Sequence, residues 1–230
     1  MNLFLLSVTI LPPVLIVIIF AVSDKFKEPN KEICLVFISG ILITIPAYFT
    51  NTFLIQDVYV NYPFISEGLA ASFLSAAAVE EGLKFLVLYL IVYRLREFNE
   101  PMDAIVYGVC ASLGFATLEN IFYIFYSDFG IEPIYLSILR GFTTIPAHAI
   151  FGVMMGYFFM RFAFIHKSKS LFLSFLIPYL LHGFYNYFIS INYFIISLTL
   201  IIASWFIGIK LFLKLRQEQR LKRREYEKKV

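Results

Sequence analysis

Long apolar stretches interrupted by short polar breaks run through the whole chain. A stretch of about 20 mostly apolar residues is what an α-helix needs to cross a bilayer. Seven such stretches lie near 2–21, 33–50, 66–93, 102–126, 134–160, 170–188 and 191–213. The pattern therefore predicts an all-α, polytopic transmembrane helix bundle of about seven spans. An eighth element would follow if residues 51–65 dip back into the membrane.

The polar breaks alternate in charge. Three of them contain Lys or Arg, namely 22–32, 94–101 and 161–169, and so does the C-terminal tail. The other three contain neither, namely 51–65, 127–133 and 188–191. Because basic loops stay on the cytoplasmic side, this alternation predicts an N-terminus outside and a C-terminus inside.

The composition fits this picture, with 230 residues that are 60% hydrophobic and 19% aromatic. Such a chain is outside the range of soluble globular proteins, and its length suits a single membrane domain over 1–230. No basic segment precedes the first apolar run, so we expect a retained first span bent at Pro12 and Pro13. Residues 210–230 are predicted to form a basic cytoplasmic tail, either a solvated topology anchor or a contact with anionic lipid.

Five ionisable residues interrupt four successive apolar stretches: Glu80, Glu81, Glu119, His148 and His182. Such residues are costly at bilayer depth and are functional candidates by default. At about 1.5 Å per residue, they lie about 18 to 25 Å above the cytoplasmic edge of a hydrocarbon core about 30 Å thick. One shared layer, central or slightly toward the outer face, is the expected result. By the same estimate, Arg140 lies about 31 Å above the cytoplasmic edge, where its side chain is expected to reach the headgroups.

The densest polar string is Glu80-Glu81-Gly82-Leu83-Lys84. On a helix, Glu80 shares a face with Lys84 at i,i+4, and Glu81 lies near Lys84 at i,i+3. One glutamate can therefore pair with Lys84 while the other faces a cavity. Two carboxyls in different environments suit acid–base chemistry. A buried ion pair that only joins helices is the alternative.

Two histidines and one carboxylate can form a zinc site with one position open for water. Glu119, His148 and His182 are the predicted ligands, and Glu80 or Glu81 would take the proton of the water. In a metal-free version a glutamate activates water, while a histidine and Asn186 stabilise the oxyanion. The sequence leaves both versions open. Buried carboxylates and histidines also form proton relays, so a proton-coupled transporter is a further alternative.

The residues around His148 predict close helix packing. Pro146 is expected to loosen the helix two residues earlier and to free a backbone carbonyl near the site. Gly152 and Gly156 form a seam of small residues that allows another helix to approach closely.

Four motifs together resemble the PrsW family of intramembrane proteases, within the wider group of type II CAAX prenyl proteases. They are Glu-Glu-x-x-Lys at 80–84, Phe-x-x-x-Glu-Asn at 115–120, the histidine at 148 and His-x-x-x-Asn at 182–186. The string Tyr107-Gly-Val-Cys-Ala-Ser-Leu-Gly-Phe-Ala-Thr-Leu-Glu-Asn120 is similar to the PrsW branch in particular. At Asn186 the chain departs from some members, in which an Asp is expected.

The resemblance implies an intramembrane endopeptidase, classed with the metallopeptidases, in the bacterial cell membrane. Its expected substrate is a single-span membrane anti-sigma factor, in which it makes the first (site-1) cut before a second protease frees the sigma factor. Glu80, Glu81 and His182 carry over as essential residues, and Glu119 and His148 as further site residues. Lys84 and Asn186 complete the predicted catalytic set, in a catalytic core near 66–190.

Overall fold

The chain folds into helices throughout the part that the computed structural model describes, residues 3–61, 67–126 and 130–227. The elements are α1 (Leu3–Ser23), α2 (Asn30–Asn61), α3 (Glu67–Leu69), the π-helical segment η1 (Ala70–Ala77), α4 (Ala78–Leu90), the 3-10 turn η2 (Val92–Arg94), α5 (Pro101–Tyr126), α6 (Pro133–Phe142), α7 (Thr144–Ala163), α8 (Ser168–Ser190) and α9 (Phe194–Glu227). No strand occurs in these ranges. The predicted all-α bundle is confirmed.

Six segments in the described ranges are long and apolar enough to cross a membrane: Leu3–Ser23, Asn30–Asp57, Pro101–Tyr126, Pro133–Ala163, Ser168–Ser190 and Phe194–Leu221. The remaining predicted span, 66–93, is described from Glu67 and consists of α3, η1 and α4, followed by η2. It packs against both α2 and α8, so it is part of the same bundle. The protein is therefore a multi-pass membrane protein.

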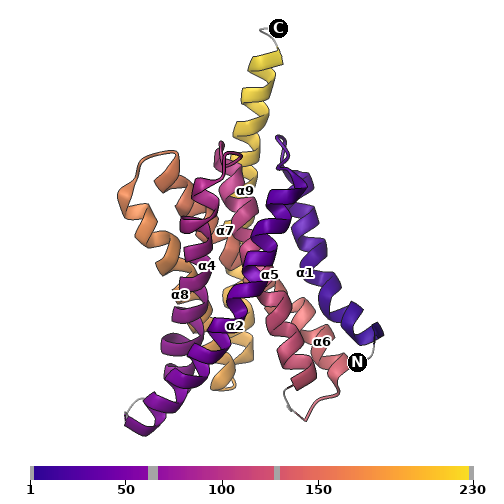
Figure 1. Cartoon of the computed structure of the whole chain (residues 1–230), viewed down its shortest axis with the longest axis vertical. Coiled ribbons are helices and arrows are strands. Elements are labelled where there is room, and N and C mark those ends of the chain that lie inside the picture. The colour runs from indigo at the N-terminus through magenta and orange to yellow at the C-terminus, as the bar shows by residue number, and fades with distance from the viewer. Residues whose placement is uncertain (1–2, 62–66, 127–129, 228–230) are drawn as a thin grey trace.

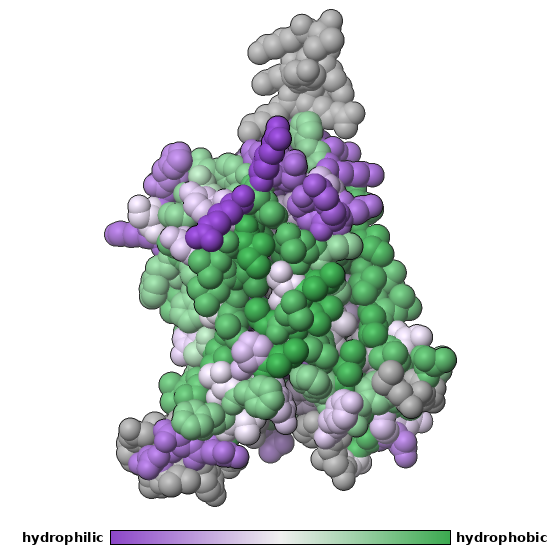
Figure 2. Space-filling model, viewed as in Figure 1, coloured by the Kyte–Doolittle hydropathy of each residue, from purple (hydrophilic) through white to green (hydrophobic). Residues whose placement is uncertain are grey.

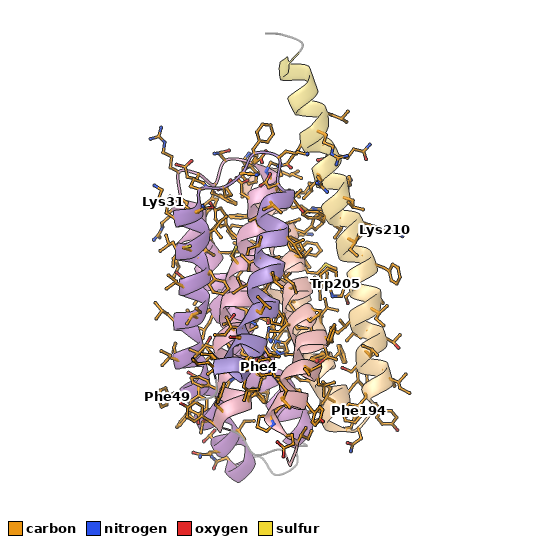
Figure 3. The ribbon with its side chains drawn as sticks, turned by 90° about the vertical axis from the view of Figure 1, so that its right-hand side faces the viewer. Phe4, Lys31, Phe49, Phe194, Trp205 and Lys210 are labelled. Carbon is orange, nitrogen blue, oxygen red and sulfur yellow. The ribbon has the colours of Figure 1, made fainter. Side chains whose placement is uncertain are left out.

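The basic breaks gather at one end of the bundle. The α1–α2, α4–α5 and α7–α8 connections lie at the end toward which α9 points, opposite the N-terminus (Figure 1). Hydrophobic residues cover the middle of the visible face, and hydrophilic residues gather at that same end (Figure 2). Lys31 lies near it, whereas the exposed rings of Phe49 and Phe194 lie in the opposite half (Figure 3). We call the end that contains these three connections the basic end. The prediction that the basic end faces the cytoplasm is not tested by the structure.

One predicted boundary is wrong. A polar break was expected to begin at residue 51. Instead, α2 continues as a helix to Asn61. The stretch 51–61 contains no Gly or Pro, so nothing in it interrupts the helix. Residues 62–66 of the predicted break lie outside the described part.

The span predicted at 134–160 is found at Pro133–Ala163, but within it α6 and α7 meet at Thr143. Pro146 explains the break, because proline has no N–H to donate to the carbonyl of Phe142, four residues earlier. The predicted loosening therefore occurs, although it is displaced to the junction before α7. His148 consequently lies in the first turns of α7 and not in the middle of a long helix.

Glycines bring the central helices α5 and α7 into backbone contact, as the Gly152–Gly156 seam predicted. A Cβ added to Gly156 would lie 2.2 Å from the carbonyl oxygen of Ala104, and one on Gly152 would lie 2.6 Å from that of Gly108. Only hydrogen fits at these positions. The seam therefore fixes α7, which carries His148, against α5, which carries Glu119.

Candidate active site

All seven predicted site residues lie in one buried region of the bundle. They come from four helices: Glu80, Glu81 and Lys84 from α4, Glu119 from α5, His148 from α7, and His182 and Asn186 from α8. Glu81 and Lys84 are fully buried, and Glu80, His148 and His182 are almost so. We call Glu80, Glu81, Lys84, Glu119, His148 and His182 the central cluster. The sequence predicted that all seven residues lie close together, and the structure places them in the same region.

Glu81 is the glutamate that pairs with Lys84. Its Oε1 accepts hydrogen bonds from Lys84 Nζ and from His182 Nδ1, each at 2.8 Å. With Nδ1 donating, the neutral His182 ring has its lone pair on Nε2, which accepts from Asn186 Nδ2 at 3.0 Å. Glu81 is thus held inside the protein, and it orients His182.

Lys84 also fixes His148. Its Nζ lies 3.2 Å from His148 Nδ1, and because an ammonium only donates, Nδ1 must accept. The ring proton is then on Nε2, which donates to Glu119 Oε2 at 3.1 Å. The two histidines therefore have opposite tautomers, each set by a charged residue of α4.

Glu80 faces a cavity of about 490 Å³, as expected for the second glutamate. The wall is formed by α2, α4 and α5 and includes Asn51, Glu80, Phe115, Glu119, Phe122 and Tyr123. Asn51 Nδ2 donates to Glu80 Oε1 at 3.3 Å. Glu80 Oε2 lies 3.9 Å from both Lys84 Nζ and His182 Nε2 and has no hydrogen-bond partner. Glu81 Oε2 also has no hydrogen-bond partner, but Glu81 is fully buried, so Glu80 is the one of the two that lines the described cavity wall.

A larger groove, of about 760 Å³, lies on another face of α4, between α2 and α8. Its described lining is almost wholly apolar and contains no ionisable side chain; it includes Pro46, Val79, Leu86, Phe172 and Phe175. Hydrolysis needs groups that transfer protons. We therefore assign the site to the smaller cavity, which contains Glu80 and Glu119.

The contacts of Arg140 were not evident from the sequence. Its Nη2 lies 3.1 Å from Glu119 Oε2, and its Nε donates to Asn120 Oδ1 at 2.7 Å. The side chain is only 12% exposed, so the expectation that it reaches the headgroups is wrong. That depth count assumed one straight helix over 134–160, whereas the break at Thr143 lets α6 take its own direction. The sequence contained one indication of this contact, because Arg140 is a charged residue within the apolar stretch 134–160.

Asn51 was also missed, and for a different reason. The sequence analysis ended the second span at residue 50, which put Asn51 in a polar loop. In the structure it is a helical residue of α2 in the cavity wall, and its Oδ1 is buried without a hydrogen-bond partner. Only the correct length of α2 could have revealed it.

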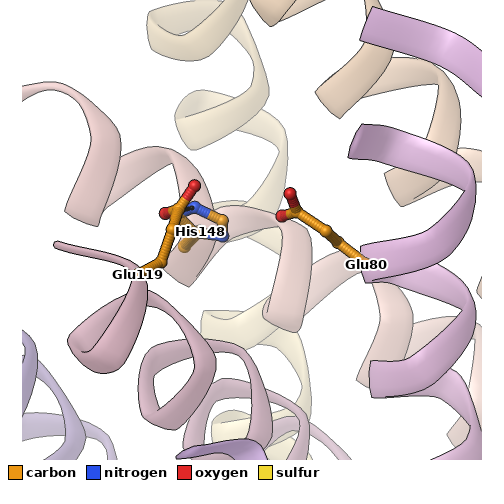
Figure 4. Close-up of side chains that lie close together, drawn as sticks. All are labelled: Glu80, Glu119 and His148. Atoms are coloured by element: carbon orange, nitrogen blue, oxygen red, sulfur yellow. Dashed lines mark hydrogen bonds and ion pairs between the residues drawn. The ribbon is translucent and has the colours of Figure 1, made fainter. Parts of the chain in front are cut away.

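The donor set suits a divalent metal. Of the three predicted ligands, Glu119 and His148 each offer one ligand atom within 4.8 Å of one another and of an oxygen of Glu80 (Figure 4). Among the described residues this group contains Glu80, predicted as a possible base, and does not contain the predicted ligand His182. His182 has a carboxylate on Nδ1 and its lone pair on Nε2, which is typical of a metal-ligating histidine. His148 needs the other tautomer to coordinate through Nε2, and its proton would then face Lys84 Nζ. Lys84 and a metal would therefore compete for His148.

Buried glutamates and histidines beside a cavity, inside a multi-span bundle, define a membrane-embedded centre suited to acid–base and metal chemistry. The profile of a family described as "PrsW family intramembrane metalloprotease" matches residues 28–212. The chain therefore belongs to the PrsW family, and it is an intramembrane protease. No solved structure matches it significantly.

Several relatives named "Protease PrsW" are similar over most of their length. The one from Geobacillus kaustophilus (strain HTA426) is 38% identical over 186 residues, which cover 80% of this chain and 78% of the relative. The one from Clostridioides difficile (strain 630) is 33% identical over 219 residues, which cover 91% of this chain and 89% of the relative. The one from Bacillus subtilis (strain 168) is 31% identical over 212 residues, which cover 90% of this chain and 93% of the relative.

Proposed function

We propose that this protease makes the site-1 cut in a single-span membrane anti-sigma factor, with Glu80 as the general base. The observation that supports Glu80 over Glu81 is the difference in their surroundings. Each has one oxygen without a hydrogen-bond partner, but Glu80 lines the cavity, whereas Glu81 is fully buried, does not belong to the described cavity wall and is bound through Oε1 by Lys84 and His182. A base needs a free oxygen within reach of water, and Glu80 meets that condition.

Glu119, His148 and His182 would hold a divalent metal, which we propose to be zinc. When bound, it would lower the pKa of a water molecule and polarise the peptide carbonyl. The chain's own groups perform the remaining steps. Glu80 takes the proton of the attacking water and delivers it to the leaving amine. Arg140 keeps Glu119 in place, and Glu81 does the same for His182.

Asn186 completes the catalytic set in this proposal. Its Nδ2 lies beside His182 Nε2 and can donate to the oxygen that becomes negative in the tetrahedral intermediate. We further propose that the catalytic core corresponds to about 66–190 and that residues 210–230 form a cytoplasmic tail. With the basic end inside, the cut falls in the central to outer layer of the bilayer.

Co-expression with a tagged candidate anti-sigma factor tests the substrate. Wild type should release a fragment cut in the central or outer part of the substrate span, and Glu80→Gln and His182→Ala should not. Equal cleavage by all three would remove the proposed site, and a cut at the cytoplasmic end of the span would refute the proposed orientation. Ion flux in liposomes without any cleavage would favour the proton pathway.

The metal is tested separately by elemental analysis of freshly purified protein. Wild type should contain about one equivalent of zinc, and His148→Ala should contain much less. Full activity of metal-free wild type would support the version in which Glu80 alone activates water.

A further inference from the structure

A second group of buried carboxylates lies at the basic end, where the α1–α2 connection meets the start of α5. Asp24, Glu100 and Asp103 each place one oxygen within 4.8 Å of the other two. Asp103 is fully buried and Asp24 is 3% exposed, while Glu100 is partly exposed. Asp103 precedes Glu119 on α5 by a distance of roughly 24 Å along the helix, so this group is separate from the central cluster.

Backbone N–H groups hold these carboxylates but satisfy only one oxygen of each aspartate. Asp103 Oδ2 accepts from the N–H groups of Asn99 and Glu100, at 2.8 and 2.7 Å. Asp24 Oδ1 accepts from the N–H of Phe26 at 3.0 Å. The other oxygens, Asp24 Oδ2 and Asp103 Oδ1, are buried without a hydrogen-bond partner. Buried polar atoms are rarely left in this state unless a ligand or water satisfies them.

No cation of the described part of the chain neutralises this charge. None of its Lys, Arg or His side chains forms an ion pair with Asp24, Glu100 or Asp103. A fourth carboxylate, Glu28, lies close by and accepts a hydrogen bond from Tyr107. Burial, and then the charge of Asp24, raise the pKa of Glu100 to about 7. Several buried carboxylates without a counter-charge are unfavourable, and a bound cation relieves that cost.

Gln219 gives an independent indication from the other end of the sequence. It belongs to α9 and is 4% exposed, so its amide is buried at the same place. Its Nε2 donates to Asp24 Oδ1 at 2.8 Å and also to Glu100. Its Oε1 is buried and has no partner. The amide thus faces Asp24 and Glu100 with its nitrogen, and a 180° rotation of the amide would turn Oε1 toward them in its place. Hard cations bind such mixed sets of carboxylate and amide oxygens.

We propose that Asp24, Glu100, Asp103 and Gln219, here called the end cluster, bind a hard divalent cation, Mg²⁺ or Ca²⁺. All donors are oxygen, with no imidazole or thiol, which favours these ions over zinc. The ion would join the α1–α2 connection and α9 to the first turn of α5. Its role would be to fasten α9 to the helix that carries Glu119.

Cation binding to the full-length protein in detergent tests this proposal. The protein carries Glu119→Gln, so that the central cluster contributes little, and is freed of metal with a chelator. Titration with Mg²⁺ alone and Ca²⁺ alone, followed by calorimetry and thermal unfolding, should show one saturable site for at least one ion. Binding to the folded state should raise the unfolding temperature by several degrees, in a concentration-dependent way.

Two variants locate the ion. Glu100→Gln removes one charge at a partly exposed position and should weaken binding about tenfold or more, because ligand charge tunes cation affinity. Gln219→Leu keeps every carboxylate and should also weaken binding. The matched control is Glu132→Gln, which removes an exposed carboxylate in the connection before α6 and should bind like the parent.

No saturable binding of either ion, or equal binding by the parent and both variants, would overturn the proposal. The end cluster would then be a set of carboxyls that share protons. The readout is cation affinity and not proteolysis, so failure of the proposed function would leave this result unaffected.

Discussion

The central cluster and the end cluster both contain several carboxylates that are mostly buried, and both include a residue of α5. They differ in what neutralises them. In the central cluster Lys84 pairs with Glu81, and Arg140, next to the cluster, pairs with Glu119. The end cluster has no ion pair in the described part of the chain, and it has unpartnered oxygens instead. Built-in cations fix most of a cluster and leave one reactive group free, whereas a cluster without them depends on an exchangeable ion.

The largest expected effect separates the two glutamates of α4. Glu80→Gln should lower the cleavage rate about 100- to 10,000-fold, the usual contribution of a general base, with little change in unfolding temperature. Glu81→Gln should lower the stability instead, because it leaves Lys84 and His182 without their carboxylate. Rates and unfolding curves of both variants check this. Similar profiles for the two variants would contradict distinct roles.

Lys84→Met should break the central cluster and leave the end cluster intact. Removing one partner of a buried pair costs about 3 to 5 kcal/mol, because the remaining charges are uncompensated. Unfolding of the detergent-solubilised protein measures this loss, and Lys31→Met, at an exposed position, is the control. Cation affinity at the end cluster should stay the same, because distant sites act independently. A normal unfolding curve would show that Lys84 is not the compensating charge.

Arg140→Gln should have a smaller effect, limited to Glu119. Hydrogen bonds to charged groups contribute about 1.5 to 3 kcal/mol, which corresponds to roughly ten- to hundredfold in rate if Glu119 loses its position. Arg140→Lys should recover part of the activity, since it restores the charge without the two-point contact. Arg96→Gln, an exposed arginine in the α4–α5 connection, should behave as wild type. Activity unchanged in Arg140→Gln would assign Arg140 a purely structural position.

The smallest expected effect is that of Asn51→Ala. It removes a single hydrogen bond of 3.3 Å to Glu80, worth about 0.5 to 1.5 kcal/mol, so the rate should fall only a few-fold. The pH profile of cleavage should shift as well, since Glu80 loses a donor to its charged form. Ser39→Ala, on an exposed part of α2, is the control. A shift equal to that of the control would exclude Asn51 as a positioning residue.

The sequence predicted the bundle and the central cluster because both depend on properties that are visible along the chain. Apolar length predicts spans, and ionisable residues within spans are rare enough to attract attention. The i,i+3 and i,i+4 spacings of α4 also predicted that one glutamate pairs with Lys84 and that the other faces a cavity. Here local helix geometry and the cost of burial lead to the same arrangement.

The missed features depend on tertiary contacts. Asp24 and Glu100 lie in polar breaks, where solvated carboxylates are the ordinary expectation, and only the packing of α9 buries them. Arg140 meets Glu119 because α6 packs against α5. Asn51 belongs to the site because α2 extends further than its apolar stretch suggests. In each case the deciding contact joins segments that are far apart in sequence.

The π-helical segment η1 directly precedes the two glutamates of α4. A π-turn contains one residue more than an α-turn, and one residue changes the angular position of everything that follows by about 100°. That angle is also the one that separates Glu80 from Glu81. Converting Ala70–Ala77 into a regular α-helix without removing the extra residue would therefore turn α4 by about 100° and exchange the inward-facing glutamate with the cavity-facing one. The winding of this segment, and not only its residue types, determines which of the two carboxylates faces the cavity.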